Sequence, residues 1–431
     1  MHENAASCVN RTIRAGQMSA IRLLVIALST SCVSMRTMGQ ALPCHYDVDL
    51  IVGPSCGSDT ASVFGAGISD EGHICGWFQC PGGTEDAFVA WNAGPLVPLT
   101  MPPGVTQSRA TDINGTTIVG HYASAGGYRG FRIQSGILAT IQPLAGGNWV
   151  EVARVNSAGV IVGAWGNTVT GPFPRAFRWE NGVLQDIAAD LLPGESRCYD
   201  INNNGAIAGF MGQTAFPNNA HAFIWQNGVV TDLGLMPGSI GTEGRAINSS
   251  NQVVGIAWFT SNNFAGYVRR GFFWQNGEFT DLGTLPGYTE IFPYDISDDG
   301  TVIVRLVSEP GGSSALSVLW KAGVMRPITP LLIAPPAQFA DLMRAINANG
   351  QIGGSVDMFN HPNWGARLRP VPRNPGDTNC DTLVNVVDLL AVITSWGNSG
   401  VDADLNADFT VNVNDLLLVI TNWTSGIGGG G

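Results

Sequence analysis

The chain has 431 residues, of which 45% are hydrophobic and only 13% are charged, so it is long and apolar enough to bury a substantial core. Its formal net charge of −12 argues against a nucleic-acid partner, because phosphate binding requires a basic surface. The 56 glycines indicate many tight turns, and we expect a mostly β, acidic protein.

Residues 1–41 have the pattern of an export signal. Arg11, Arg14 and Arg22 precede the apolar run 23–33, which is too short to span a bilayer. We therefore expect residues 1–41 to be a signal peptide and the protein to be secreted or held at the cell surface, with no transmembrane segment after cleavage. A retained amphipathic tail is the alternative.

Export makes the remaining cysteines candidates for disulfides, since the compartment is oxidising. They are Cys44, Cys56, Cys75, Cys80, Cys198 and Cys380. The stretch "CGWFQC" favours Cys75 with Cys80 across a hairpin, and Cys44 with Cys56 is the next pair, although sequence alone does not determine the pairing. Neither the spacing nor the six histidines indicate a zinc site.

The middle of the chain repeats one phrase, seen in full as "AINSSNQVVGIAW" followed by "FFWQNGEFTDLG". Seven copies align on an Asn or Ser that recurs every 42 to 50 residues, at Ser69, Asn114, Asn156, Asn202, Asn248, Ser297 and Asn347. Each copy contains four strand signals separated by turn residues, including Asn-Gly pairs that suit two-residue hairpins.

A four-stranded sheet of this size, apolar on both faces, must stack on its copies. We therefore expect residues 42–372 to form a seven-bladed β-propeller. The seventh copy ends after its third strand, and "HYDVDLIVGP" near the start of the mature chain resembles the missing fourth strand, so this N-terminal strand is expected to close the last blade. An open solenoid of the same units is the alternative.

The repeated phrase resembles the HAF repeat of bacterial secreted proteins, over about residues 46–372. The resemblance implies export and a repetitive β architecture. It implies no reaction, because that family offers no accepted catalytic residues to carry over.

The repeated residues themselves are expected to be structural. The aligned Asn should begin a tight turn by bonding to backbone two residues on, and the Asp of "DLG" (Asp186, Asp232 and Asp281) should accept backbone bonds at a strand end. The recurring tryptophans are expected to fill space between the sheets. They are Trp91, Trp179, Trp225, Trp274 and Trp320.

One position that differs between copies gives the catalytic candidates. The residue before the Ile or Val of each copy is Gly67, Asp112, Arg154, Asp200, Ala246, Asp295 or Ala345. If the first strand is innermost, Asp112, Asp200 and Asp295 lie near the central channel, where paired carboxylates could serve glycoside hydrolysis. The alternative, which we favour, is that each Asp bonds the neighbouring blade.

After a Pro-rich linker at 373–376, residues 377–424 contain two copies of D-x-N-x-D-x-x-V-N-x-x-D, 27 residues apart, each followed by an apolar helix. Oxygen ligands at positions 1, 3, 5, 7, 9 and 12 can wrap a calcium ion. The first set is Asp377, Asn379, Asp381, the Leu383 carbonyl, Asn385 and Asp388. The second set is Asp404, Asn406, Asp408, the Thr410 carbonyl, Asn412 and Asp415.

Each helix is expected to pack one apolar face on the other. The expected faces are Leu389, Leu390, Val392, Ile393 and Trp396, and Leu416, Leu417, Val419, Ile420 and Trp423. The duplicated pattern resembles a type I dockerin, over residues 376–424, which implies two bound calcium ions and a cohesin-like partner.

Two departures weaken that implication. Position 6 of each loop, normally Gly, is Thr382 or Phe409, which should soften calcium affinity. Positions 10 and 11, where dockerins choose their cohesin, are Val386-Val387 and Val413-Asn414 rather than hydroxyl or basic pairs. Residues 425–431 are expected to be a Gly-rich tail.

These features together predict a secreted, non-catalytic propeller that displays loops for binding, with a glycan as the candidate ligand, attached through a calcium-dependent module. A carbohydrate-active enzyme using the channel carboxylates is the alternative, and a purely structural surface protein is a third.

Overall fold

The computed structural model describes residues 42–57, 59–167, 174–191, 194–212, 217–261, 266–308, 315–333, 339–358, 361–371, 374–380, 383–398, 402–406 and 410–424. All of them belong to one compact unit, Gly39–Gly431. The expected signal peptide and Gly-rich tail lie outside the described residues.

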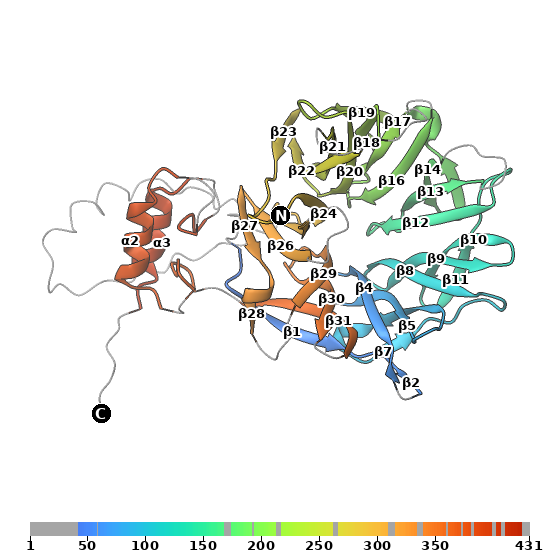
Figure 1. Ribbon diagram of the computed structural model, residues 1–431, viewed down its shortest axis with the longest axis horizontal. Helices are drawn as coiled ribbons and strands as arrows, with labels where there is room; N and C mark the ends of the chain where they lie inside the picture. Colours follow the sequence, from blue (N-terminus) through green and yellow to red (C-terminus); the bar gives the residue numbers. More distant parts are fainter. Residues whose placement is uncertain are drawn as a thin grey trace, which may run out of the picture. The chain divides into compact units, whose positions relative to one another are not determined.

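Seven sheets follow one another around a ring, six with four strands and the last with five (Figure 1). The first blade comprises β4 (Ser62–Ile68), β5 (Ile74–Gln79), β6 (Glu85–Ala90) and β7 (Leu96–Pro98). The second comprises β8 (Gln107–Asn114), β9 (Thr117–Ser124), β10 (Gly127–Gln134) and β11 (Ile137–Ile141). The third comprises β12 (Trp149–Val155), β13 (Ile161–Gly166), β14 (Arg175–Glu180) and β15 (Val183–Asp186).

The fourth blade comprises β16 (Glu195–Ile201), β17 (Ile207–Gly212), β18 (Ala220–Gln226) and β19 (Val229–Gly234). The fifth comprises β20 (Gly241–Ile247), β21 (Val253–Thr260), β22 (Tyr267–Gln275) and β23 (Glu278–Asp281). The sixth comprises β24 (Glu290–Ile296), β25 (Val302–Val307), β26 (Ala315–Lys321) and β27 (Val324–Pro327). The seventh comprises β29 (Phe339–Ile346), β30 (Ile352–Met358), β31 (His361–Val371), β1 (His45–Ile51) and β28 (Leu332–Ile333).

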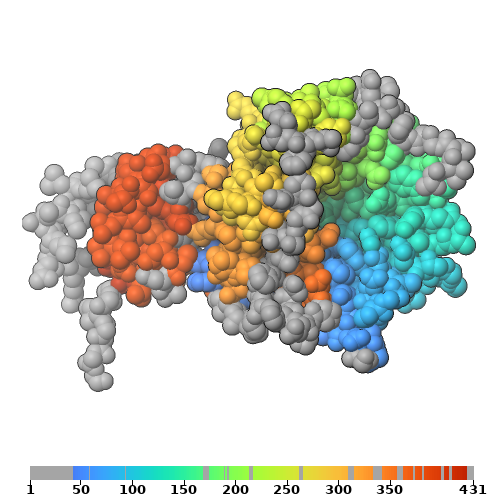
Figure 2. Space-filling view, viewed as in Figure 1, coloured from blue at the N-terminus to red at the C-terminus, as the bar shows by residue number. Residues whose placement is uncertain are grey.

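The predicted seven-bladed β-propeller is therefore confirmed, and so is its closure by the N-terminal strand. β1 pairs antiparallel with β31 along its whole length, from His45 opposite Val371 to Ile51 opposite Gly365. The first blade also lies directly against the last, where the Gly65 amide donates to Ser355 Oγ at 3.2 Å. In Figure 2 the blue first blade and the orange seventh blade meet accordingly. The open solenoid is excluded.

The strands form within each blade as the turn chemistry predicts. Asn227 and Gly228, between β18 and β19, both adopt positive φ, at 51° and 80°, which matches the right-handed twist of the hairpin. Gly209, in the "IAG" of the second strand, has a different purpose. A Cβ there would lie 1.9 Å from the main-chain oxygen of Arg197 on the first strand, so the two strands approach too closely for any side chain.

The core lies between adjacent blades. Ile224 and Ala222 of the fourth blade share one apolar cluster with Val253 and Phe272 of the fifth. The phenylalanine of the third strand recurs as the fully buried residue at Phe88, Phe131, Phe177, Phe223 and Phe272. A large aromatic side chain at the same place in successive blades fills the space where two twisted sheets meet.

The tryptophan expectation is right for some copies and wrong for another. Trp179, Trp225 and Trp320 are buried and Trp274 is half-buried, but Trp91 is 38% exposed. The difference arises because β6 ends at Ala90, and Trp91 begins the 3-10 turn Trp91–Ala93 outside the sheet. Two further 3-10 turns are Ala188–Asp190 and Thr329–Leu331.

The C-terminal segment contains two helices, α2 (Val386–Thr394) and α3 (Val413–Thr421), each begun by an asparagine cap, Asn385 or Asn412. The apolar cores expected on them are only partly right. Val392 and Val419 are fully buried, with Leu389 and Leu416 packed beside them. The remaining members of each expected face are between 40% and 53% exposed, namely Leu390, Ile393, Trp396, Leu417, Ile420 and Trp423.

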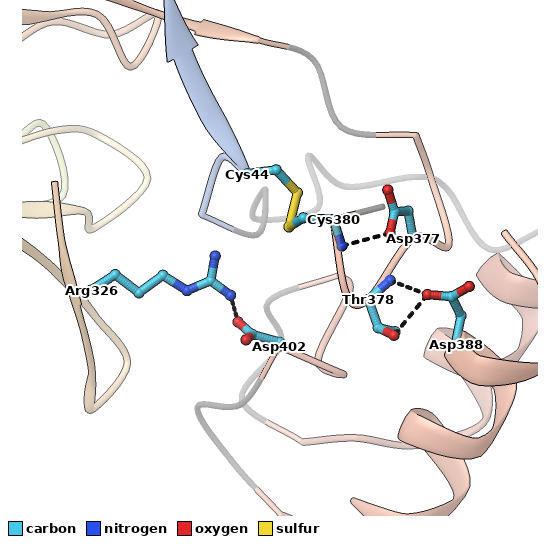
Figure 3. The surroundings of a disulfide bond; sticks show 7 residues. All are labelled: Cys44, Arg326, Asp377, Thr378, Cys380, Asp388 and Asp402. Atoms are coloured by element: carbon cyan, nitrogen blue, oxygen red, sulfur yellow. Dashed lines mark hydrogen bonds and ion pairs between the residues drawn. A yellow bond between two sulfur atoms is a disulfide. The ribbon is translucent and has the colours of Figure 1, made fainter. Parts of the chain in front are cut away.

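The disulfides are Cys56–Cys80 and Cys44–Cys380, so both expected pairings are wrong. Cys75 and Cys80 lie near opposite ends of the one strand β5, and five residues of extended chain hold them about 16 Å apart, well beyond disulfide reach. Cys75 and Cys198 are instead buried free thiols. Cys44, just before β1, reaches the first of the two acidic loops (Figure 3).

Among the described residues, no helix combines the length and the apolar content that a membrane span requires.

Candidate functional site

A β-bulge occurs at the same place in the first strand of every blade. The pairing between first and second strands shifts by one residue there in each of the seven sheets. The bulged residues are Ala66, Thr111, Ala153, Tyr199, Arg245, Tyr294 and Arg344. A bulge re-aims side chains, and here it presents two consecutive residues of each first strand toward the channel.

The channel accordingly contains two cavities. All seven bulged residues line one cavity of about 290 Å³, which we call the arginine pocket. Five of the residues that directly follow them line another cavity of about 170 Å³, the aspartate pocket, namely Asp112, Arg154, Asp200, Asp295 and Ala345. Of the described residues, only Arg154 lines both.

The three candidate aspartates do lie together near the channel, as predicted, and Arg154 stands among them. Its guanidinium nitrogens are 3.7 Å from Asp112 Oδ1, 3.7 Å from Asp200 Oδ1 and 3.8 Å from Asp295 Oδ2. Sequence reasoning listed Arg154 in the same column without assigning it a role. Each carboxylate comes from an even-numbered blade, so one arginine from the third blade links three blades across the axis.

Each aspartate also bonds the neighbouring blade, which confirms the favoured interpretation. Asp112 Oδ2 accepts from the Val155 amide at 2.9 Å, Asp200 Oδ2 from Ile247 at 2.8 Å, and Asp295 Oδ2 from Ile346 at 2.9 Å. Asp112 and Asp200 turn their other oxygen, Oδ1, toward Arg154, whereas Asp295 uses Oδ2 for both contacts. These carboxylates therefore hold blades together, whatever else they do.

The cluster contains three carboxylates and one guanidinium, and the pKa values of the aspartates are raised. Burial raises the pKa of Asp200 to about 7 and that of Asp295 to about 6, with Arg154 opposing both shifts. Burial also raises the pKa of Asp112. The carboxylates outweigh the effect of burial on Arg154 and hold its pKa above the ordinary value.

The arginine pocket differs from the rest of this acidic chain, because five arginines line it. Three of them have a carboxylate partner: Arg109 pairs with Glu85, Arg197 with Glu151 at 2.8 Å, and Arg245 lies 2.7 Å from Glu243. The fourth is Arg154. The fifth is Arg344.

Aromatic rings hold the guanidinium groups in place. Arg109 lies 4.8 Å and Arg344 5.6 Å from the centre of the Trp77 ring, and Arg245 lies 4.5 Å from that of Tyr199. Flat cations stacked on rings have few accessible rotamers. The pocket is therefore a preorganised array of hydrogen-bond donors.

His121 is the titratable imidazole of this pocket. Burial lowers its pKa, and its Nδ1 is buried without a hydrogen-bond partner among the described residues. Glu151 lines the same cavity. A neutral imidazole beside a carboxylate can accept or deliver a proton, so both are added to the candidate residues.

The sequence alone did not predict this pocket. The signal lay one residue earlier than the aspartate column, where the copies read Ala, Thr, Ala, Tyr, Arg, Tyr and Arg. A regular strand would turn that column away from the channel. Only the bulge brings both columns of residues to the channel, and no pattern in the sequence predicts the bulge.

The two C-terminal loops have matching hydrogen bonds. Asp388 accepts from the Thr378 amide at 2.7 Å, as Figure 3 shows, and from the Asn385 amide at 2.9 Å. Asp415 accepts from the Leu405 amide at 2.6 Å and the Asn412 amide at 2.9 Å. Both carboxylates are fully buried. Neither forms an ion pair with a described arginine or lysine.

The remaining expected ligands divide into two groups. Asp377, Asp404 and Asn406 are buried in the same loops, and Asn379, Leu383, Asn385, Thr410 and Asn412 are also described. Asp381 and Asp408, at position 5, lie outside the described residues. No group of three or more His, Cys, Asp or Glu within metal-binding reach occurs in the described segments. The donors present are oxygens in a buried carboxylate setting, and they fit calcium.

No protein-family model and no curated protein matches the sequence. Among solved structures, the β-propeller domain of the Trilobed protease from Pyrococcus furiosus is similar at 10% identity and a TM-score of 0.48, covering 70% of this chain and 94% of that one. An oligogalacturonate lyase from Vibrio parahaemolyticus is similar at 10% identity and 0.46, covering 76% and 97%. The Pyrococcus horikoshii acylaminoacyl peptidase is similar at 9% identity and 0.46, covering 72% and 52%. None of these likenesses bears on what this chain binds.

Proposed function

We propose that this is an exported binding protein, whose propeller holds a small ligand in the arginine pocket and whose C-terminal segment is a calcium-dependent attachment module. The observation that carries the proposal is the pocket itself: a cavity of about 290 Å³ in which several arginines are fixed on aromatic rings. A cavity of this size at the lower end of small-molecule sites suits one sugar unit or a molecule of similar size.

A glycan is the proposed ligand class. Arginines, tyrosines and a tryptophan provide many hydrogen-bond donors and flat apolar surface, the two features that polyhydroxylated rings require. The test is a glycan array probed with the full chain, followed by calorimetry on the hits. Absence of binding to every glycan, with the protein folded, would overturn this part of the proposal.

The alternative is a carbohydrate-active enzyme. One observation favours it: the pKa of Asp200, raised to about 7, is suited to general acid catalysis near neutral pH. The bonds of Asp200 to Ile247 and toward Arg154 count against it, because they occupy both oxygens. Turnover of a polysaccharide that Asp200→Asn abolishes would establish the enzyme, and binding without turnover would support the binding protein.

The C-terminal module is proposed to bind two calcium ions and to function as a dockerin-like attachment module. The matching bonds around Asp388 and Asp415 support this, because both loops close in the same way on a buried carboxylate. Calorimetric titration of the full chain should give two ions, and Asp388→Asn or Asp415→Asn should each remove one. Asp402→Asn, in the same module but outside the ligand sets, is the control.

A cohesin-like or cell-surface protein is the proposed partner of this module. Its support is the apolar exposure of the helices: Val386 and Val387 are 54% and 50% exposed, and Leu390, Leu417 and Ile420 are exposed too. A purified cohesin on a sensor surface tests the partner, with calcium and with chelator. Equal binding in both conditions, or none, would contradict calcium-dependent docking.

Secretion is proposed from the N-terminal signal pattern and is supported by the two disulfides, which persist in oxidising compartments.

A further inference from the structure

Arg344 is the lining arginine of the pocket that has no carboxylate partner among the described residues. Arg109, Arg197 and Arg245 each lie against a glutamate, and Arg154 lies among three aspartates. The Arg344 Nε is buried and makes no hydrogen bond within the described chain. Its contacts are the faces of Trp77, at 5.6 Å, and Tyr294, at 5.7 Å.

The surroundings of Arg344 are unfavourable to a cation. Burial lowers its pKa, Tyr294 opposes that shift, and the positive charges of Arg305, Arg109 and Arg154 lower the pKa further. Arg305, on β25, also has a buried Nε without a partner in the described segments. Because a guanidinium stays protonated in proteins, the charge persists and remains uncompensated.

Arg344 is half-buried, and a partly desolvated charge without a counterion is costly to a folded protein unless something neutralises it. The paired arginines of the pocket supply donors but little net charge, so the excess at Arg344 amounts to about one positive charge. A planar monoanion matches a single guanidinium fork, which binds carboxylates through two parallel hydrogen bonds.

We infer that Arg344 anchors the carboxylate of a small acidic ligand, a sugar acid or an aliphatic organic acid, in the arginine pocket. This inference rests on the proposed function in taking that pocket as the ligand site, and it adds the charge of the ligand. A neutral sugar would leave the Arg344 charge unmatched.

The test compares two ligands that differ at one group. D-glucuronate and D-glucose share a ring, and only the former carries a carboxylate at C6. Calorimetry on the full chain should show glucuronate binding at least tenfold more tightly than glucose. Succinate and acetate form a second arm, which tells a sugar acid from an organic acid as the source of the carboxylate.

The matched variants are Arg344→Gln, which removes the charge, and Arg270→Gln, which changes an exposed arginine on β22 outside the arginine pocket. Arg344→Gln should weaken carboxylate binding at least tenfold, and Arg270→Gln should leave it unchanged. Thermal unfolding distinguishes a ligand anchor from a purely structural arginine. Without ligand, Arg344→Gln should keep or raise the melting temperature, because it removes an unmatched charge, whereas loss of a structural arginine would lower it.

The outcomes separate the two proposals. Equal affinity for glucuronate and glucose, or carboxylate binding that survives Arg344→Gln, overturns the inference and leaves a glycan-binding propeller standing. Binding of succinate or acetate that depends on Arg344, with no glycan bound on the array, supports the inference and overturns the glycan. A melting temperature of unliganded Arg344→Gln below that of the parent protein overturns the inference, because Arg344 would then contribute to packing.

Discussion

The side-chain amide of Asn347 in the seventh blade donates a 2.7 Å hydrogen bond to the main-chain oxygen of Ser69 in the first, 278 residues earlier. The equivalent amides of Asn156, Asn202 and Asn248 make the same bond to the next blade, at 3.2, 2.8 and 3.1 Å. The oxygen of the same side chain accepts from its own turn, as Asn347 Oδ1 does from Asn349 and Gln351. One residue thus shapes a turn and joins two blades.

We predict that Asn347→Ala lowers the free energy of unfolding by about 2 kcal/mol, because it leaves turn amides and a buried carbonyl without partners. Asn347→Ser should cost about half as much. Serine stands at this position in the first and sixth blades, where Ser297 Oγ still accepts from the Thr301 amide at 3.2 Å. Urea unfolding measures both. An Asn347→Ser variant as stable as the parent protein would show that the bond between blades contributes nothing.

Gly209→Ala should lower the free energy of unfolding by about 2–3 kcal/mol, since its Cβ would meet the Arg197 oxygen at 1.9 Å and neither strand can move without disturbing the channel. Gly266→Ala is the control, because no atom lies within 4 Å of the Cβ it would add. That variant should stay within about 0.5 kcal/mol of the parent protein. A tolerated alanine at 209 would contradict the close approach of these strands.

The aspartate cluster predicts a pH dependence. An aspartate in the unfolded chain titrates near pH 3.9, whereas Asp200 and Asp295 titrate at about 7 and about 6 when folded. The folded state thus binds more protons between these values, so this part of the stability is complete below about pH 4 and is lost as pH rises through 6 and 7.

We therefore expect Asp200→Asn to be more stable than the parent protein at pH 8, by about 1 kcal/mol, with the difference shrinking toward pH 5. Urea midpoints across this range measure it. Asp281→Asn, at the outer end of the fifth blade, is the control and should leave the pH slope unchanged. A parent slope that Asp200→Asn does not flatten would refute the assignment.

Peptide mapping under non-reducing conditions should recover Cys44 joined to Cys380 and Cys56 joined to Cys80. Cys75 and Cys198 should resist alkylation in the folded protein and react fully in denaturant, because both are buried and burial raises the pKa of each thiol. Recovery of a Cys75–Cys80 peptide would contradict the structure.

The sequence predicted the ring well because the information it needs is local and repeated seven times. The turn residues, the strand spacing and the incomplete seventh copy together specify blades and a closing strand, and β1 lies where this reasoning put it. The role of the Asp232 carboxylate was equally local, and it accepts from the Gly234 amide at 2.8 Å.

The errors concern partners brought together only by the closed ring or by a shift of register. Cys44 meets Cys380 across a sequence separation of 336, which no spacing rule anticipates. Arg344 and Arg154 occupy neighbouring positions of the repeat, and both reach the channel because each first strand contains a β-bulge. Trp91 is exposed because its strand ends one residue early.

The Cys44–Cys380 bond has a mechanical consequence. A pull on the C-terminal segment would enter the propeller at Cys44, next to β1, as well as through β31. Those two strands are neighbours in the closing blade, so the tension would pass into a single sheet at both points. Such a force would load the ring as a body and would not draw its two ends apart.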